Sequence, residues 1–244
     1  MEIWGVTDKG KVRAMNQDVF MTMRCEEREV AVLVVCDGMG GARSGDVASF
    51  VATERFMAVV REYIDMDYGL DEIAERLPDA ALQANTAVYE RSLRDPGCAG
   101  MGTTLVAAAV MENGEAIVNI GDSRAYHIAD GSIRRVTRDH SVVEEMVERG
   151  DITREQARTH SSRNLITRSL GSPSGDAADV FLLALKQGEY ILLCSDGLSN
   201  VVTDEEIQRE VTSGSDVKAI CDSLLELALL RGAPDNVTVV LLKK

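Results

Sequence analysis

A continuous apolar run that stops abruptly at glycine marks the most regular part of the chain. Residues 30–36 read VAVLVVC and are followed by DGMGG at 37–41. A β-branched run this short predicts a buried strand, and the glycines predict that it runs into a tight loop. Apolar residues then recur at helical spacing over about 44–64 and again over 80–93, where Pro78 is expected to open a second helix. We expect these two helices to pack side by side on a sheet.

Three pairs of strand-like runs are separated by short polar turns and predict antiparallel hairpins. The pairs are 103–111 with 115–120, 125–128 with 132–136, and 181–185 with 190–194. The first turn contains Asn113-Gly114, a dipeptide that supplies the positive φ angles of tight hairpin turns. Hairpins in succession indicate antiparallel sheets and not a doubly wound parallel sheet.

The stretch from about 141 to 175 has a different character. It begins with a helical pattern at 142–149, stopped by Gly150, and continues as a polar, arginine-rich segment that we expect to lie as a flap over a surface. The rest of the chain predicts helices at 204–211 and 216–230 and a last strand at 236–242. No repeat or linker-like run divides the sequence, so a single domain over 1–244, with no sensor or membrane region attached, is expected.

Composition narrows the classes of partner. The chain has 244 residues, 45% of them apolar, which suits one large core. Its formal charge of −14 would repel nucleic acid and anionic membranes, so neither is an expected partner, and an anionic substrate would need positive charge from metal or arginine. There is no apolar stretch of signal-peptide or membrane-span length, and the five scattered cysteines fit reduced thiols. We expect a cytoplasmic monomer.

Four aspartates stand where a strand-like run meets a glycine or a turn. They are Asp37, Asp122, Asp196 and Asp235. An Asp-Gly pair alone is also an ordinary turn dipeptide, but four carboxylates brought together would repel one another unless cations neutralised them. Oxygen donors without His or Cys at ligand spacing favour Mg²⁺ or Mn²⁺ over zinc. Two such ions about 3.5–4 Å apart lower the pKa of a shared water and clamp a phosphoryl group for in-line attack.

Seven short motifs follow one another in a characteristic order. They are GVTDKG at 5–10 with Arg13 and NQD at 16–18, DGMGG at 37–41, GTT at 102–104, GDSR at 121–124, RNLITR at 163–168, SDG at 195–197, and Asp235-Asn236. In this order, and over nearly the whole chain, they resemble the metal-dependent type 2C protein phosphatases, the PPM family, in its bacterial branch. The resemblance implies an α+β fold: a four-layer αββα sandwich of two antiparallel sheets flanked by helix pairs, with a flap insertion.

The resemblance also implies a set of metal ligands. Asp37 would bridge two catalytic ions, and Asp196 and Asp235 would complete the first ion's ligands. The backbone carbonyl of Gly38 would bind the second ion. Asp122, together with Asp196, would hold a third and looser ion.

Two further residues receive roles in the same way. Asp18 would act on the metals through a bound water, and Arg13 would grip the substrate phosphate with its forked guanidinium. The implied catalytic residues are Asp37, Asp196 and Arg13.

The activity implied is metal-dependent hydrolysis of phosphoserine and phosphothreonine in proteins, with Mn²⁺ or Mg²⁺ as cofactor, in signalling that opposes serine/threonine kinases. The partners would be phosphorylated proteins, among them a kinase or its substrates. Two alternatives share these sequence features: a phosphatase or diesterase acting on small molecules or nucleotides, and a non-catalytic module that binds phosphoproteins.

The chain departs from the family pattern at the group that protonates the leaving alkoxide. Relatives carry a histidine directly after the Asp-Gly pair or directly after Gly-Gly, where this chain has Met39 and Ala42. General acid catalysis is typically worth 10²–10⁴-fold. His140, His160 and a metal-bound water are the remaining candidates.

Four arginines of the flap are candidates for recognising a phosphopeptide. They are Arg154, Arg158, Arg163 and Arg168. The alternative for each is that it is solvated or pairs with one of the many nearby carboxylates.

Overall fold

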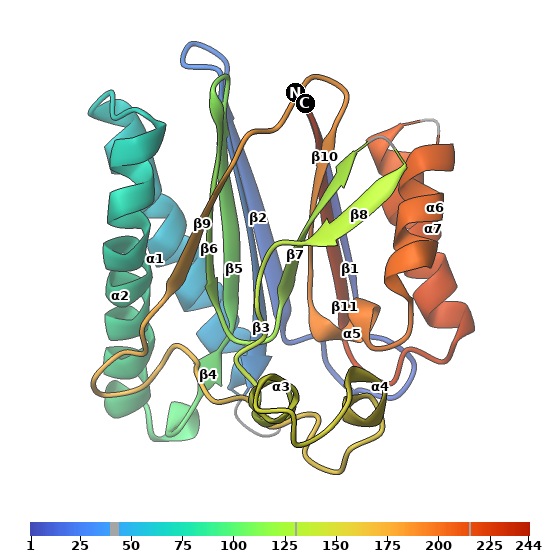
Figure 1. Ribbon diagram of the computed structural model, residues 1–244. Helices are drawn as coiled ribbons and strands as arrows, with labels where there is room; N and C mark the ends of the chain where they lie inside the picture. Colours follow the sequence, from blue (N-terminus) through green and yellow to red (C-terminus); the bar gives the residue numbers. More distant parts are fainter. Residues whose placement is uncertain (40–43, 130, 215) are drawn as a thin grey trace.

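The computed structural model describes residues 1–39, 44–129, 131–214 and 216–244, and within them two antiparallel sheets pack face to face between two layers of helices (Figure 1). One sheet has the order β1 (Glu2–Asp8), β11 (Val237–Lys243), β10 (Tyr190–Cys194), β7 (Arg124–Ala129), β8 (Ser132–Arg135). The other has the order β2 (Asp18–Cys25), β3 (Val30–Met39), β5 (Leu105–Met111), β6 (Gly114–Ile120), β9 (Asp179–Leu183), with β4 (Gly102–Thr103) paired to β3. The α+β sandwich predicted from the sequence is confirmed.

Helices cover both outer faces and one end of the sandwich (Figure 1). The pair α1 (Gly45–Asp65) and α2 (Leu70–Arg94) lies on the six-stranded sheet, and α6 (Asp204–Ser213) and α7 (Val217–Leu230) lie on the five-stranded sheet. Three short helices are α5 (Asp196–Ser199), α3 (Val142–Glu148) and α4 (Arg154–Ala157), and a 3₁₀ turn spans Pro96–Cys98. The predicted flap contributes α3 and α4, which lie at the end of the sandwich away from the two termini.

The apolar run of β3 is continuous because both faces of that strand are covered. Val32 and Val34 pack in the cluster with α1 and α2, whereas Leu33 and Val35 belong to the cluster between the sheets. A strand buried on both sides needs no polar alternation.

The first two predicted hairpins are confirmed, and the third is wrong. β5 pairs with β6, and β7 pairs with β8, both antiparallel. In contrast, β9 pairs with β6 in one sheet, while β10 pairs with β7 and β11 in the other. The connection between β9 and β10 therefore crosses from sheet to sheet, and Leu185 is buried in the cluster between them. The turn residues favour a local hairpin, but burial of Leu185 between the sheets favours the crossing connection that is observed.

Pro78 lies inside α2 and does not open it, so this prediction is wrong. The helix begins at Leu70, where the Glu72 carboxylate accepts a hydrogen bond from the Gly69 N–H at 3.0 Å. A proline within a helix loses one backbone hydrogen bond. Burial of apolar side chains such as Leu77 offsets that loss, because packing supplies most helical stability in proteins.

The structure also describes the state of the cysteines and the lengths of the helices. All five cysteines are free thiols. Among the residues that the structure describes, none of the helices combines the length and the apolar character needed to span a bilayer.

Glu115, in β6 at the end away from the flap, gives a testable pH effect. It is fully buried, and neither carboxylate oxygen has a hydrogen-bond partner among the described residues. Burial raises its pKa from 4.5 to about 7, so this group costs increasing stability as the pH rises from about 4.5 to 7. We expect Glu115→Gln to raise the Tm by on the order of 5 °C at pH 8 and by much less at pH 5, measured by calorimetry.

The matched control is Glu112→Gln, at an exposed residue of the neighbouring turn, whose Tm difference from wild type should not change between the two pH values. An equal Tm difference for Glu115→Gln at pH 5 and pH 8 would contradict the explanation.

Candidate functional site

Strand ends from both sheets meet in one cavity of about 520 Å³ at the flap end of the sandwich. Six of the residues singled out from the sequence line it: Arg13, Asp37, Gly38, Asp122, Asp196 and Asp235. Asp37 lies in β3 and Asp122 follows β6 in one sheet, while Asp196 follows β10 in the other. The sandwich therefore gathers aspartates that are up to 198 positions apart (235 − 37) along the chain.

The carboxylates of this cavity are difficult to ionise together. Loss of hydration, with repulsion from the other aspartates, raises the pKa of Asp37 and of Asp122 well above the usual range. The same causes raise the pKa of Asp196 to about 6. A positive charge among them would relieve this cost.

Asp18 lies just behind the cavity and is buried. One oxygen, Oδ2, accepts hydrogen bonds from the Ser195 and Thr238 hydroxyls, each at 2.7 Å. The other, Oδ1, has no hydrogen-bond partner among the described residues. Burial raises the pKa of this carboxyl to about 7, opposed by the two hydroxyls.

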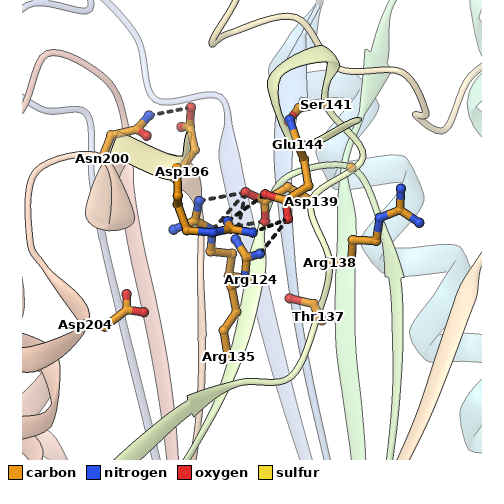
Figure 2. Close-up of polar contacts among 12 residues, drawn as sticks. Arg124, Arg135, Thr137, Arg138, Asp139, Ser141, Glu144, Asp196, Asn200 and Asp204 are labelled. Atoms are coloured by element: carbon orange, nitrogen blue, oxygen red, sulfur yellow. Dashed lines mark hydrogen bonds and ion pairs between the residues drawn. The ribbon is translucent and has the colours of Figure 1, made fainter. Parts of the chain in front are cut away.

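The donor set fits a hard divalent cation. All the candidate ligands are oxygens, and the buried Asp196 Oδ1 lacks a partner among the described residues, while its Oδ2 accepts from the Asn200 amide at 3.0 Å (Figure 2). Across residues 1–39, 44–129, 131–214 and 216–244, however, no three His, Cys, Asp or Glu side chains converge closely enough to hold an ion as they stand. Arg13 pairs with Asp235 at 2.6 Å. A cation would have to draw the carboxylates together and release Arg13 from this pair.

The structure gives a steric reason for glycine at position 38, whereas the sequence predicted a tight loop there. β3 does not end in a tight loop at Asp37 but continues to Met39, with Gly38 paired to Thr103. A Cβ on Gly38 would lie 2.0 Å from the Gly45 carbonyl oxygen. The glycine thus allows the start of α1 to approach the strand. Residues 40 and 41 of the predicted loop, and Ala42 after them, lie outside the described part of the chain.

Asn236 positions the segment that carries Arg13, a role that the sequence did not reveal. Its Oδ1 accepts from the Gln17 N–H at 2.8 Å, and its Nδ2 donates to the carbonyls of Lys9 and Met15, both at 2.9 Å. These three bonds tie residues 9–17 to the start of β11. The only sequence signal was that Asn236 directly follows Asp235.

The two histidines proposed as proton donors do not line this cavity. His140 is buried: its Nδ1 accepts from the Gly121 N–H at 3.1 Å, so Nε2 carries the proton and faces Asp179 Oδ2 at 3.1 Å. Burial lowers its pKa. His160 Nδ1 accepts from the Ser162 N–H. No histidine is found in the described lining of the cavity, so the departure at Met39 is not compensated there.

Two of the four flap arginines are paired within the protein. Arg154 binds Glu144 through two hydrogen bonds of 2.8 and 2.9 Å, and Arg168 binds Asp179 at 3.0 Å. For these two side chains the alternative of pairing with nearby carboxylates is correct.

Comparison with known sequences gives one consistent result. The model of the family described as protein phosphatase 2C matches residues 9–226. A serine/threonine phosphatase stp of Listeria monocytogenes is 33% identical over 238 residues, which cover 98% of this chain and 94% of that protein. The serine/threonine protein phosphatase PstP of Mycobacterium tuberculosis is 39% identical over 236 residues, covering 96% of this chain but 43% of PstP.

Solved structures agree with the sequence matches. The serine/threonine phosphatase Stp1 from Staphylococcus aureus superposes with a TM-score of 0.93 at 35% identity, covering 100% of this chain and 94% of that one. The catalytic domain of PstP in complex with two manganese ions superposes with a TM-score of 0.84 at 34% identity, covering 98% and 96%.

Proposed function

The chain is a serine/threonine protein phosphatase of the protein phosphatase 2C family, and on that premise we propose that it hydrolyses phosphoserine and phosphothreonine with two divalent cations held in the aspartate cavity. The observation that carries this mechanism is that strand ends of both sheets bring Asp37, Asp122, Asp196 and Asp235 into one cavity with Arg13. Mn²⁺ or Mg²⁺ suits these oxygen ligands, and the related PstP catalytic domain has been solved with manganese.

The aspartates of the cavity and the Gly38 carbonyl are the proposed metal ligands. Asp37 would bind both ions, Asp196 and Asp235 would bind the first, and the Gly38 carbonyl would bind the second. Asp122 with Asp196 is assigned to a third ion. The loss of hydration and the mutual repulsion that raise the pKa of Asp37 and Asp122 support this assignment, because both costs fall when cations are present.

The remaining chemistry belongs to side chains of the chain itself. Bound cations would lower the pKa of water and neutralise phosphoryl charge. Arg13, once released from Asp235, binds the phosphate through its guanidinium fork. Asp18, fixed by Ser195 and Thr238, offers its unpartnered Oδ1 to a water of the site. Of the three candidate proton donors for the leaving alkoxide we assign the role to a water of the site, since neither His140 nor His160 lines the cavity.

The domain organisation, compartment and partners of the enzyme are part of the same proposal. We infer a single catalytic domain over residues 1–244 with a flap over about 141–175, acting as a monomer in the cytoplasm on proteins that serine/threonine kinases phosphorylate. The formal charge of −14 supports the exclusion of nucleic acid and anionic membranes as partners.

Phosphate release from a phosphothreonine peptide in Mn²⁺, Mg²⁺ or EDTA tests the two-cation mechanism. Wild type should release phosphate with either ion and none in EDTA, and Asp196→Asn should lower release by about 10³-fold, because stabilisation of transition-state charge by metal is worth several kcal/mol. The control is Asp65→Asn at the exposed end of α1, which should behave as wild type. Release that persists in EDTA would refute the mechanism, and faster turnover of nucleotide than of phosphopeptide would favour the small-molecule alternative.

A further inference from the structure

A second cavity, of about 480 Å³, borders the first and shares Asp122 and Asp196 with it. The flap forms one of its walls, and the segment around α5 that leads to α6 forms another. Five arginines contribute to its lining: Arg124, Arg135, Arg154, Arg158 and Arg163. In a chain of net charge −14, this is a notable concentration of positive charge.

Three of these arginines are held in a network with two buried carboxylates, of which Figure 2 shows the part around Arg124, Arg135 and Asp139. Arg124 binds Asp139 through contacts of 2.6–3.1 Å, and Arg135 donates to Glu144 at 3.0 Å. Arg154 binds the same Glu144 with both of its terminal nitrogens. The network joins β7 and β8 to the flap helices and fixes α4 against the sandwich, so each of its three arginines already has a carboxylate partner.

Arg158 and Arg163 differ from this network. Arg158 directly follows α4, and Arg163 follows a turn in which its N–H donates to the His160 carbonyl at 3.1 Å. Both side chains are exposed, and neither makes an ion pair or a side-chain hydrogen bond to any residue that the structure describes, although Arg158 interacts electrostatically with the exposed carboxylate of Glu205. Their guanidinium groups are therefore available to a ligand in the second cavity.

The charge of the cavity favours an anionic ligand. Asp122 and Asp196 belong to the proposed cation site, which leaves five arginines against Asp139, Glu144 and Asp204 in the lining. The excess is two positive charges (5 − 3), the number contributed by Arg158 and Arg163. A guanidinium fork matches the oxygens of a phosphate or a carboxylate.

We propose that Arg158 and Arg163 form a subsite for a second anionic side chain, phosphorylated or carboxylic, on the phosphoprotein substrate. The proposal rests on the proposed function, because the scissile phosphate is assigned to the neighbouring cavity. The shared wall of Asp122 and Asp196 places the second cavity directly beside the first, so we expect it to face residues of the peptide next to the one whose phosphate enters the first cavity. The enzyme is then selective for segments that carry acidic residues or a second phosphate near the target residue.

Matched phosphopeptides test the subsite. Each carries one phosphothreonine and, at successive positions on either side, a second phosphoserine, a glutamate or an alanine. With wild type in Mn²⁺, kcat/KM should be roughly tenfold higher for at least one phosphoserine or glutamate peptide than for its alanine counterpart, through KM, and the difference should shrink with added salt. The phosphoserine and glutamate arms separate recognition of phosphate from recognition of carboxylate.

The double variant Arg158→Ala/Arg163→Ala should lose this preference, and Arg158→Lys/Arg163→Lys should keep only part of it, because lysine retains the charge without the fork. The control Arg149→Ala removes a flap arginine that pairs with Asp151 outside the cavity and should keep the wild-type preference. Equal kcat/KM for the anionic and alanine peptides, or a preference that survives in the double alanine variant, would overturn the subsite. Absence of release from every peptide would instead count against the proposed function.

Discussion

Asp37→Asn is expected to abolish metal-dependent phosphate release, by about 10³-fold or more, while making the metal-free protein more stable. Asp37 is the residue assigned to both cations, so its loss removes the charge that holds them together. In metal-free protein the same carboxylate is poorly hydrated and is repelled by Asp18, Asp196, Asp122 and Asp235. An amide of similar shape removes one of the repelling charges.

The stability gain of Asp37→Asn should grow with pH. A carboxyl group whose pKa is higher in the folded than in the unfolded protein destabilises the fold as the pH rises. In the folded protein the pKa is about 6 for Asp196 and about 7 for Asp18. In EDTA the variant should therefore exceed the wild-type Tm more at pH 8 than at pH 5. Mn²⁺ should raise the Tm of wild type but hardly that of the variant, because a metal ion stabilises only a folded protein that binds it. An Asp37→Asn protein with wild-type turnover, or with the wild-type response to Mn²⁺, would contradict the assignment.

Gly197→Ala is expected to destabilise the fold by about 3 kcal/mol or more, lowering the Tm by on the order of 10 °C. A Cβ at this position would lie 1.8 Å from the carbonyl oxygen of Asn236 and 2.8 Å from its carbonyl carbon. Both are backbone atoms, which cannot rotate away. Relief would require the end of β10 to separate from the start of β11, the place where Asp196 and Asp235 meet in the cavity.

Thermal unfolding of Gly197→Ala beside Gly69→Ala isolates the steric cause. Gly69 precedes α2 with a φ of −76°, and its nearest contact for a new Cβ is 3.9 Å away, so alanine should fit there within about 0.5 kcal/mol. Both variants lose the same backbone freedom in the unfolded chain. If they melted together, close backbone approach would not explain Gly197.

Local pattern predicted the elements whose stability depends on near neighbours. The run at 30–36, the hairpin connection at 112–114 and the end of the flap helix at Gly150 each place their signal within a few residues. The turn itself is formed by Glu112 and Asn113, and Asn113 does not adopt the positive φ that the prediction assumed. Predictions failed where distant burial competes with a local preference. The turn after β9 favours a hairpin, yet burial of Leu185 between the sheets carries the chain across, and Pro78 continues a helix whose buried face outweighs one lost hydrogen bond.

The candidate site divides in the same way. Motif order pointed to Asp37, Asp122, Asp196, Asp235 and Arg13, and the structure places all five along one cavity. The positioning roles of Asn236, Asn200 and the hydroxyls around Asp18 were missed, since a polar side chain becomes a positioning group only when the fold brings its partners to it.

The sequence by itself determined the family, the sandwich of antiparallel sheets and the acidic residues of the site, because strand runs, glycines and carboxylates are properties of short segments and their order. Only the tertiary structure decided that β9 and β10 belong to different sheets, that His140 is held by Gly121 and Asp179, and that Arg158 and Arg163 have no ion-pair partner in the described part of the chain. Those outcomes depend on hydrogen bonds, burial and charge between residues far apart in the chain, and such distances are set only when the two sheets pack against each other.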